Sequence, residues 1–179
     1  MELLKEIFRT QGLRISGKTV HRQAVRGIIT NNSELLMIHV TQNGTFKFPG
    51  GGILDGETHS QALAREIREE CGMAVTMIGP AFGKVIEYAA AYEPDFDVFK
   101  MTSYYYYCQV QPTAFAQNLD PYEKEMGFQP TWISIADALD RNQAAKASDP
   151  NDILFWNRRE IFVLESLRNT QDYEWDYTT

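Results

Sequence analysis

Cysteine is scarce in this chain, and no apolar stretch is long enough to cross a membrane. The 179 residues include two cysteines, too few for the disulfide framework of a small secreted domain. Wholly apolar runs extend over only a few residues, which excludes a transmembrane helix. The first residues carry two glutamates and no apolar segment, so no signal peptide is expected. These absences predict a cytoplasmic protein with no membrane partner.

Positive charge is also in deficit. The chain has 17 Lys and Arg against 24 Asp and Glu, a net charge of −7, which argues against polymeric DNA or RNA as a partner. The charge is uneven, because residues 1–26 carry six basic and two acidic side chains. These bases are interpreted either as solvated surface or as contacts to a small anion. A hydrophobic fraction of 44% and a charged fraction of 23% are typical of one globular domain.

The hydrophobic pattern predicts a mixed sheet with helices packed on it. Apolar residues at helical spacing predict a short helix over residues 2–10, and three prolines predict a loop over 112–130. Further helices are predicted over 58–71, 136–141 and 152–167, and strands over 20–30, 35–41, 46–48, 75–78, 84–88, 98–111 and 131–135. We therefore expect an N-terminal helical extension at 1–18, one domain at 19–168 and a flexible C-terminal tail at 169–179.

Three glutamates stand close together in the predicted helix over residues 58–71. Glu66, Glu69 and Glu70 occupy positions i, i+3 and i+4, which lie on one face of a helix. Like charges at this spacing destabilise a bare helix, whereas a hard cation such as Mg²⁺ or Mn²⁺ prefers oxygen ligands and offsets the repulsion. Arg65 lies four residues before Glu69, where it can orient a liganding carboxylate. The pattern therefore predicts a divalent-metal site.

Glycines precede this helix, and together with it they resemble a known motif. Glycine at 50–52 allows backbone amides and carbonyls to approach a metal or a phosphate closely. The segment 51–73 resembles the signature of the Nudix hydrolases, G-x5-E-x7-R-E-U-x-E-E-x-G-U, where U is a bulky aliphatic residue. All fixed positions match, namely Gly51, Glu57, Arg65, Glu66, Glu69, Glu70 and Gly72, and Ile67 and Met73 fill the U positions. The flanking sequence extends the resemblance over roughly residues 20–168.

The resemblance implies an α/β/α sandwich with a mixed sheet and a MutT-like pyrophosphohydrolase. Such enzymes use Mg²⁺ or Mn²⁺ and an activated water to cleave the pyrophosphate linkage of a nucleoside diphosphate joined to another group. The implied metal ligands are Glu66, Glu69 and Glu70, with the Gly50 carbonyl completing the set and Glu57 nearby. Glu66, Glu69, Glu70 and Arg65 are the implied catalytic residues.

The general base stays open at this point. Within the motif we favour Glu69 or Glu70. Outside it, Glu123 and Glu125 precede a predicted strand and are the first candidates. Acids near residue 95 are weaker candidates, namely Glu93, Asp95 and Asp97.

The substrate also stays open, between a nucleoside triphosphate and a nucleotide sugar such as ADP-ribose. The proline array of NADH-cleaving relatives is absent, and Ala89 stands where many ADP-ribose-cleaving relatives have proline. Arg26 and Lys47 are candidate phosphate contacts. Phe46 and Tyr88 are candidate base contacts, with core packing as the alternative interpretation.

Two further hypotheses concern binding rather than catalysis. Residues 1–18 are candidates for a homodimer contact or a substrate lid. The whole chain is alternatively a non-catalytic nucleotide sensor, a class whose members tend to lose the motif's acids or to carry a DNA-binding helical module. All acids of the motif are present here and no basic helix-turn-helix pattern follows, so the hydrolase is the leading hypothesis.

Overall fold

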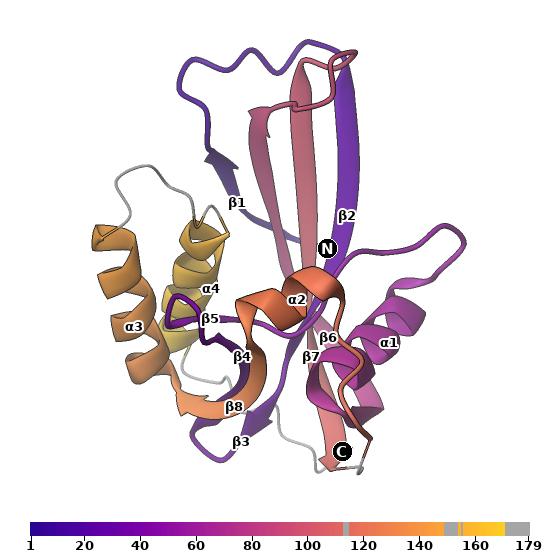
Figure 1. Cartoon of the computed structure of the whole chain (residues 1–179), viewed down its shortest axis with the longest axis vertical. Helices are drawn as coiled ribbons and strands as arrows, with labels where there is room; N and C mark the ends of the chain where they lie inside the picture. Colours follow the sequence, from indigo (N-terminus) through magenta and orange to yellow (C-terminus); the bar gives the residue numbers. More distant parts are fainter. Residues whose placement is uncertain (113–114, 149–153, 155, 171–179) are drawn as a thin grey trace.

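The computed structural model describes residues 1–112, 115–148, 154 and 156–170, and these form two sheets flanked by helices (Figure 1). The first sheet has the strand order β1-β6-β7-β2, with β1 (Leu3–Phe8), β2 (Thr19–Ile28), β6 (Met73–Ala90) and β7 (Val98–Pro112). In the second, β4 (Glu34–Val40) pairs with β3 (Thr30–Asn31), β5 (Thr45–Lys47) and β8 (Phe128–Ser134). The helices are α1 (His59–Cys71), α2 (Pro121–Met126), α3 (Ile135–Ala147) and α4 (Asn157–Asn169).

The first sheet is mixed and has helices on both sides. β1 runs parallel to β6, β2 runs parallel to β7, and β6 is antiparallel to β7. Figure 1 shows α1 on one side of these strands and α3 and α4 on the other. One apolar cluster joins the strands to α3 and α4, and another joins them to α1. The predicted α/β/α sandwich with a mixed sheet is confirmed.

The helix that carries the three glutamates begins and ends where its sequence requires. The Thr58 side chain accepts the Gln61 N–H and the Gln61 side chain accepts the Thr58 N–H, which satisfies donors that the first turn leaves unpaired. Gly72 closes the helix in the left-handed region at φ 66° and donates to the Arg68 carbonyl at 3.0 Å. The predicted start and end of this helix are confirmed.

The predicted N-terminal helical extension is wrong. Residues 3–8 form the strand β1, which lies on the edge of the first sheet next to β6. Leu4 and Ile7, two of the residues that suggested a helix, pack partly buried against the core. A nine-residue helix is marginal on its own, whereas the free edge of β6 supplies backbone partners along its length. Tertiary context thus overrides the local pattern.

Other predicted elements differ in extent. The strands expected at 75–78 and 84–88 form one strand, β6, whose pairing with β7 shifts register between Ile78 and Gly83. Such bulges accommodate Pro80, which has no N–H to donate. The helix predicted at 136–141 extends further as α3, and α4 begins at Asn157. Residues 152, 153 and 155 of the predicted last helix and 171–179 of the predicted tail lie outside the described residues.

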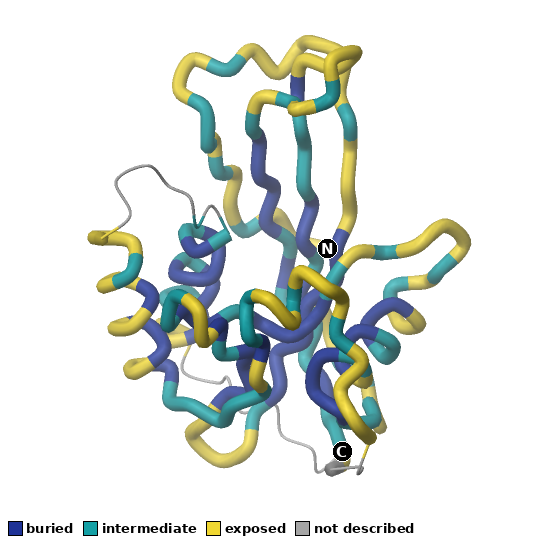
Figure 2. The backbone as a smooth tube through the Cα atoms, in the orientation of Figure 1, coloured by how far each residue is buried: buried dark blue, intermediate teal, exposed yellow. Residues whose placement is uncertain are grey.

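Burial divides the molecule into a packed base and an exposed tip. Figure 2 shows buried positions where the two sheets meet the helices, and mostly exposed ones in the turns at the far end of β2, β6 and β7. Both cysteines are buried and free. No helix in the described part of the chain combines the length and apolar character that crossing a membrane needs.

Candidate functional site

The glycine-rich loop before α1 is fixed to β2 by its backbone. The N–H groups of Gly27 and Val25 donate to the carbonyls of Pro49 and Gly51 at 2.9 and 3.0 Å. Gly50, between them, has φ 129°, and a Cβ there would overlap the Val25 carbonyl oxygen. Only glycine fits this close approach, so the loop is held beside the last residues of β2, the strand that contacts α1.

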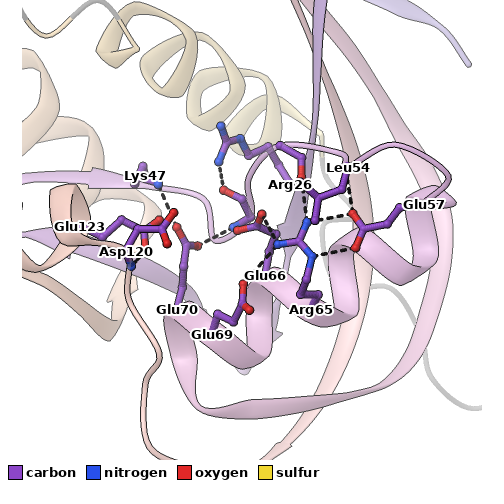
Figure 3. Close-up of polar contacts among 12 residues, drawn as sticks. Arg26, Lys47, Leu54, Glu57, Arg65, Glu66, Glu69, Glu70, Asp120 and Glu123 are labelled. Carbon is purple, nitrogen blue, oxygen red and sulfur yellow. Dashed lines mark hydrogen bonds and ion pairs between the residues drawn. The ribbon is translucent and has the colours of Figure 1, made fainter.

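Arg65 gathers the acidic side chains of the α1 region. Its Nε and Nη2 donate to the two carboxylate oxygens of Glu57 at 2.7 and 2.9 Å, and Nη1 donates to Glu66 at 2.7 Å and to Glu69 at 3.2 Å. Nη2 also donates to the Gly52 carbonyl at 2.9 Å. Figure 3 shows this fan of contacts. Arg65 thus sets the direction of three carboxylates and ties them to the glycine loop.

Glu70 is the most enclosed of the three helix glutamates, with 1% of its surface exposed. Its Oε2 accepts the Gly50 N–H at 2.6 Å, and its Oε1 accepts from Lys47 Nζ at 3.0 Å. Lys47 Nζ also lies 4.2 Å from the centroid of the Phe128 ring. On the other side, Arg26 donates to the Gly50 carbonyl. The backbone of Gly50 is therefore held through both its N–H and its carbonyl.

The site holds an excess of negative charge. Burial raises the pKa of the Glu66 carboxyl, Arg65 lowers it, and the neighbouring charge of Glu70 raises it again, with a net upward shift. Burial also raises the pKa of Glu123, and the charge of Glu70 adds to that rise. Figure 3 shows Glu123, on α2, beside Lys47 and Glu70. Carboxyls that resist ionisation next to one another are typical of sites that take up positive charge.

The donor chemistry of this region fits a hard divalent cation. The available groups are carboxylate and carbonyl oxygens, the ligands that Mg²⁺ and Mn²⁺ prefer. In the described residues no three acidic, His or Cys side chains are arranged as a ready-made metal cage. Instead, Arg65 and Lys47 occupy the carboxylates of Glu66, Glu69 and Glu70. Cation binding therefore requires these side chains to rotate away from their present partners.

The remaining predicted site residues are spread over the molecule. Glu125 is exposed on α2, two residues from Glu123. The acids of the β6–β7 turn face β2, where Glu93 lies 3.8 Å from Arg22 and Asp97 accepts the Lys18 N–H at 2.8 Å. The structure therefore does not bring the acids of this turn to the carboxylates of α1.

The predicted aromatic contacts do not open into the site. Phe46 is 6% exposed and stacks on His39 with ring centroids 4.7 Å apart. Tyr88 stacks on Phe8 at 5.1 Å and donates to Glu6 at 3.2 Å, within a separate cluster next to β1. Core packing, the alternative interpretation, describes both residues in this structure.

A groove lies beside the carboxylates. It has a volume of about 710 Å³ and is bordered by Arg65, Arg68 and Glu69 of α1 and by Phe115 and Asn118. This volume is within the range of pockets that hold small molecules. The groove therefore offers space for a ligand in contact with two residues of the α1 site.

The sequence pattern predicts a loop where the structure has α2, although the start and stop signals of a helix are present there. Asp120 precedes Pro121 at the first turn, Glu123 accepts the Asp120 N–H at 2.9 Å, and Gly127 closes the helix at φ 69°. Proline at the first position and glycine just after the end are recognised start and stop signals. Attention to this spacing would have placed Glu123 on a defined helix rather than in a loop.

The Glu57–Arg65 contact predicts a pH dependence of stability. Hydrogen bonding to Arg65, and to the Leu54 N–H, lowers the pKa of Glu57 from 4.5 to about 2. A lowered carboxyl pKa stabilises the fold above the unfolded value and loses that contribution as the pH falls from about 4.5 towards 2. The difference in urea stability between the wild type and Glu57→Gln should therefore be larger at pH 7 than at pH 3. An equal difference at both values would contradict the assigned contact.

The family assignment follows from a family-model comparison. The model described as NUDIX domain matches residues 20–156. The chain belongs to the NUDIX domain family. This confirms the resemblance noted in the 51–73 segment, and the matched range runs from β2 to Trp156, just before α4, and includes the whole acidic site.

Individual relatives match this NUDIX domain either over a short segment or at low sequence identity. The ADP-ribose pyrophosphatase of Methanocaldococcus jannaschii is 43% identical over 53 residues, which cover 28% of this chain and 31% of the relative. A NUDIX hydrolase from Nitrosomonas europaea is 18% identical, with TM-score 0.52, over 80% of this chain and 90% of that one. A structure described as ADP compounds hydrolase is 20% identical, with TM-score 0.50, over 82% and 73%. The solved structures show a shared fold.

Proposed function

We propose that this chain hydrolyses the pyrophosphate linkage of a nucleoside diphosphate joined to another group, in a reaction that depends on Mg²⁺ or Mn²⁺. The observation that carries the proposal is the enclosed carboxylate set of α1, held against the glycine loop by Arg65. Glu66, Glu69, Glu70 and the Gly50 carbonyl would hold the cation, with Glu57 next to them through Arg65. Bound Mg²⁺ would supply positive charge to the diphosphate and acidify a water molecule.

The protein's own residues then have distinct tasks. Arg65 orients Glu66 and Glu69, and a bound cation would replace part of the positive charge that Arg65 now supplies to them. Lys47 and Arg26 already lie within hydrogen-bonding reach of the site, next to Glu70 and Gly50, which supports them as phosphate contacts. The groove bordered by Arg68 and the Phe115 segment supports space for the rest of the substrate.

Glu123 is the general base that we favour outside the motif. It is half-buried beside Glu70, and its pKa is raised by that burial and by the Glu70 charge. A raised carboxyl pKa strengthens a base that must take a proton from water near neutral pH. Glu69 remains the alternative within the motif, because a third of its side chain is accessible while both Glu70 oxygens are engaged.

Two substitutions on α2 separate these bases. Glu123→Gln is expected to lower kcat by about 10²-fold, within the range for loss of general base catalysis. Glu125→Gln, two residues away and exposed, should leave kcat within about twofold. Steady-state kinetics of both variants checks this. Equal kcat values in the two variants would contradict Glu123 as the general base and favour Glu69.

The substrate is tested by product identification. The archaeal ADP-ribose pyrophosphatase makes ADP-ribose the first compound to assay, and nucleoside triphosphates are the alternative. AMP and ribose 5-phosphate would identify the former, whereas a nucleoside monophosphate and pyrophosphate would identify the latter. Activity should vanish with a chelator and return with Mg²⁺ or Mn²⁺. Absence of any product from the whole nucleotide panel with either metal would refute the proposal.

A further inference from the structure

A fully buried carboxylate on α4 contacts the chain just before the glycine loop. Glu160 has no exposed surface, and its Oε2 accepts the Phe48 N–H at 3.1 Å. Its Oε1 accepts from Nη2 and Nε of Arg159 at 2.6 and 3.1 Å. Glu160 lies outside the sequence motif, and apolar packing alone does not require a charge at this position.

The charge of Glu160 belongs to a buried ionic series that links α4 to β6 of the first sheet. Arg159 also donates to Glu87 on β6, and Arg9, the residue after β1, lies 3.8 Å from Glu87. The side chains of Glu87, Arg159 and Glu160 are 5% exposed or less. Burying charges costs desolvation energy, and a well-packed apolar set is often as stable. Stability alone therefore does not explain these buried charges, and the segment that they hold in place indicates another role.

The series holds one end of a short segment whose other end lies in the acidic site. Phe48 is bound by Glu160 of α4, and Gly50, two residues later, donates its N–H to Glu70 of α1 at 2.6 Å. Pro49, between them, has no N–H. The two helices flank the first sheet from opposite sides (Figure 1). Carboxylates from both sides thus grip the segment 48–50.

The strand that leads into this segment is held in the same way. Asn142 of α3 accepts the Phe46 N–H at 2.7 Å and donates to the Phe46 carbonyl at 2.8 Å. The Phe48 ring is fully buried and meets the Tyr105 ring edge-on, with centroids 5.6 Å apart. The loop around Gly50 is bonded to β2 at Pro49 and Gly51, and Arg26 donates to the Gly50 carbonyl. Glu160 and α3 add the contacts that fix the segment just before Gly50, at Phe46 and Phe48.

We propose that Glu160 is a positioning residue that aims the Gly50 carbonyl at the divalent cation. This inference rests on the proposed function, in which that carbonyl is a ligand. Loss of the Glu160 charge leaves either the Phe48 N–H or the Arg159 guanidinium without its acceptor, because a glutamine amide offers one oxygen instead of two. The segment then loosens by a fraction of an ångström, and the carbonyl no longer meets the cation in the required geometry.

The test is Mn²⁺ affinity of the free, full-length protein, measured by electron paramagnetic resonance without substrate. Glu160→Gln is expected to raise the Mn²⁺ dissociation constant about tenfold, as outer partners of metal ligands do. The matched control is Leu167→Ala, which opens a buried site two turns further along α4. It should lower the melting temperature yet leave the dissociation constant within about twofold.

The outcomes separate this inference from the proposed function. Equal Mn²⁺ affinity in Glu160→Gln and Leu167→Ala, with Glu70→Gln impaired, overturns the positioning role alone. Wild-type affinity in Glu70→Gln overturns the proposed function. Should Glu160→Gln fail to fold, Glu160→Asp replaces it, since this change keeps the charge but shortens the side chain that spans Phe48 and Arg159. An unchanged dissociation constant in Glu160→Asp would then overturn the proposal.

Discussion

Replacement of Glu70 by glutamine is expected to lower kcat by about 100-fold or more, the effect of removing a charge-stabilising group from an active site. The Gln side chain still accepts the Gly50 N–H, so the loop keeps its contact, but the negative charge that Lys47 contacts and that a bound cation would need is gone. Steady-state kinetics at saturating Mg²⁺ measures the loss, and circular dichroism shows whether the fold is intact.

Two further variants test whether the effect of Glu70→Gln is specific to the α1 carboxylates. Glu69→Gln, on the same helix face but a third accessible, should cause a loss of similar size, with less effect on folding. Glu34→Gln, at an exposed position at the start of β4, should be neutral. Retained activity in both Glu69→Gln and Glu70→Gln would show that α1 does not hold the ligands.

Substitution of Gly51 by alanine should disable the site while leaving the fold in place. A Cβ at residue 51 would overlap the carboxylate of Glu66, whose atoms are its three nearest neighbours. Because a carboxylate end can swing away, the cost falls on the position of Glu66 rather than on the backbone. A displacement of about 1 Å in such a group can lower turnover by about 10²-fold.

Gly52 provides the matched control for this prediction. A Cβ there meets no atom within 4 Å, and its backbone is not in the left-handed region. Gly52→Ala should therefore keep kcat within about twofold, with both variants melting near the wild-type temperature. Similar activities in the two variants would mean that the Glu66 carboxylate is not needed where the structure has it.

The acidic site was predictable because its residues are local in sequence. The spacing of Glu66, Glu69 and Glu70 follows from helix geometry alone, and Thr58 and Gly72 mark where that helix begins and ends. Such short-range rules need no knowledge of the rest of the chain. For this reason the motif, the helix and the fold class all agree with the structure.

Contacts between distant segments were not predictable in the same way. Lys47 reaches Glu70 across 23 positions, and Phe48 reaches Glu160 across 112. Neither pair leaves a periodic or spacing signal in a single sequence. The helix prediction for residues 2–10 was wrong for a related reason. The free edge of β6, with which Leu3–Phe8 pair, exists only once β6 has folded.

The central claim is that the α1 carboxylates bind a divalent cation. A crystal structure of the protein with Mn²⁺, recorded at an energy that reveals the anomalous signal of the metal, tests it most directly. We expect a peak about 2.1 Å from oxygens of Glu66, Glu69 or Glu70 and from the Gly50 carbonyl, with Arg65 turned away from at least one carboxylate. An anomalous map with no metal peak beside α1, in a structure where Arg65 and Lys47 still contact these glutamates, would contradict the account.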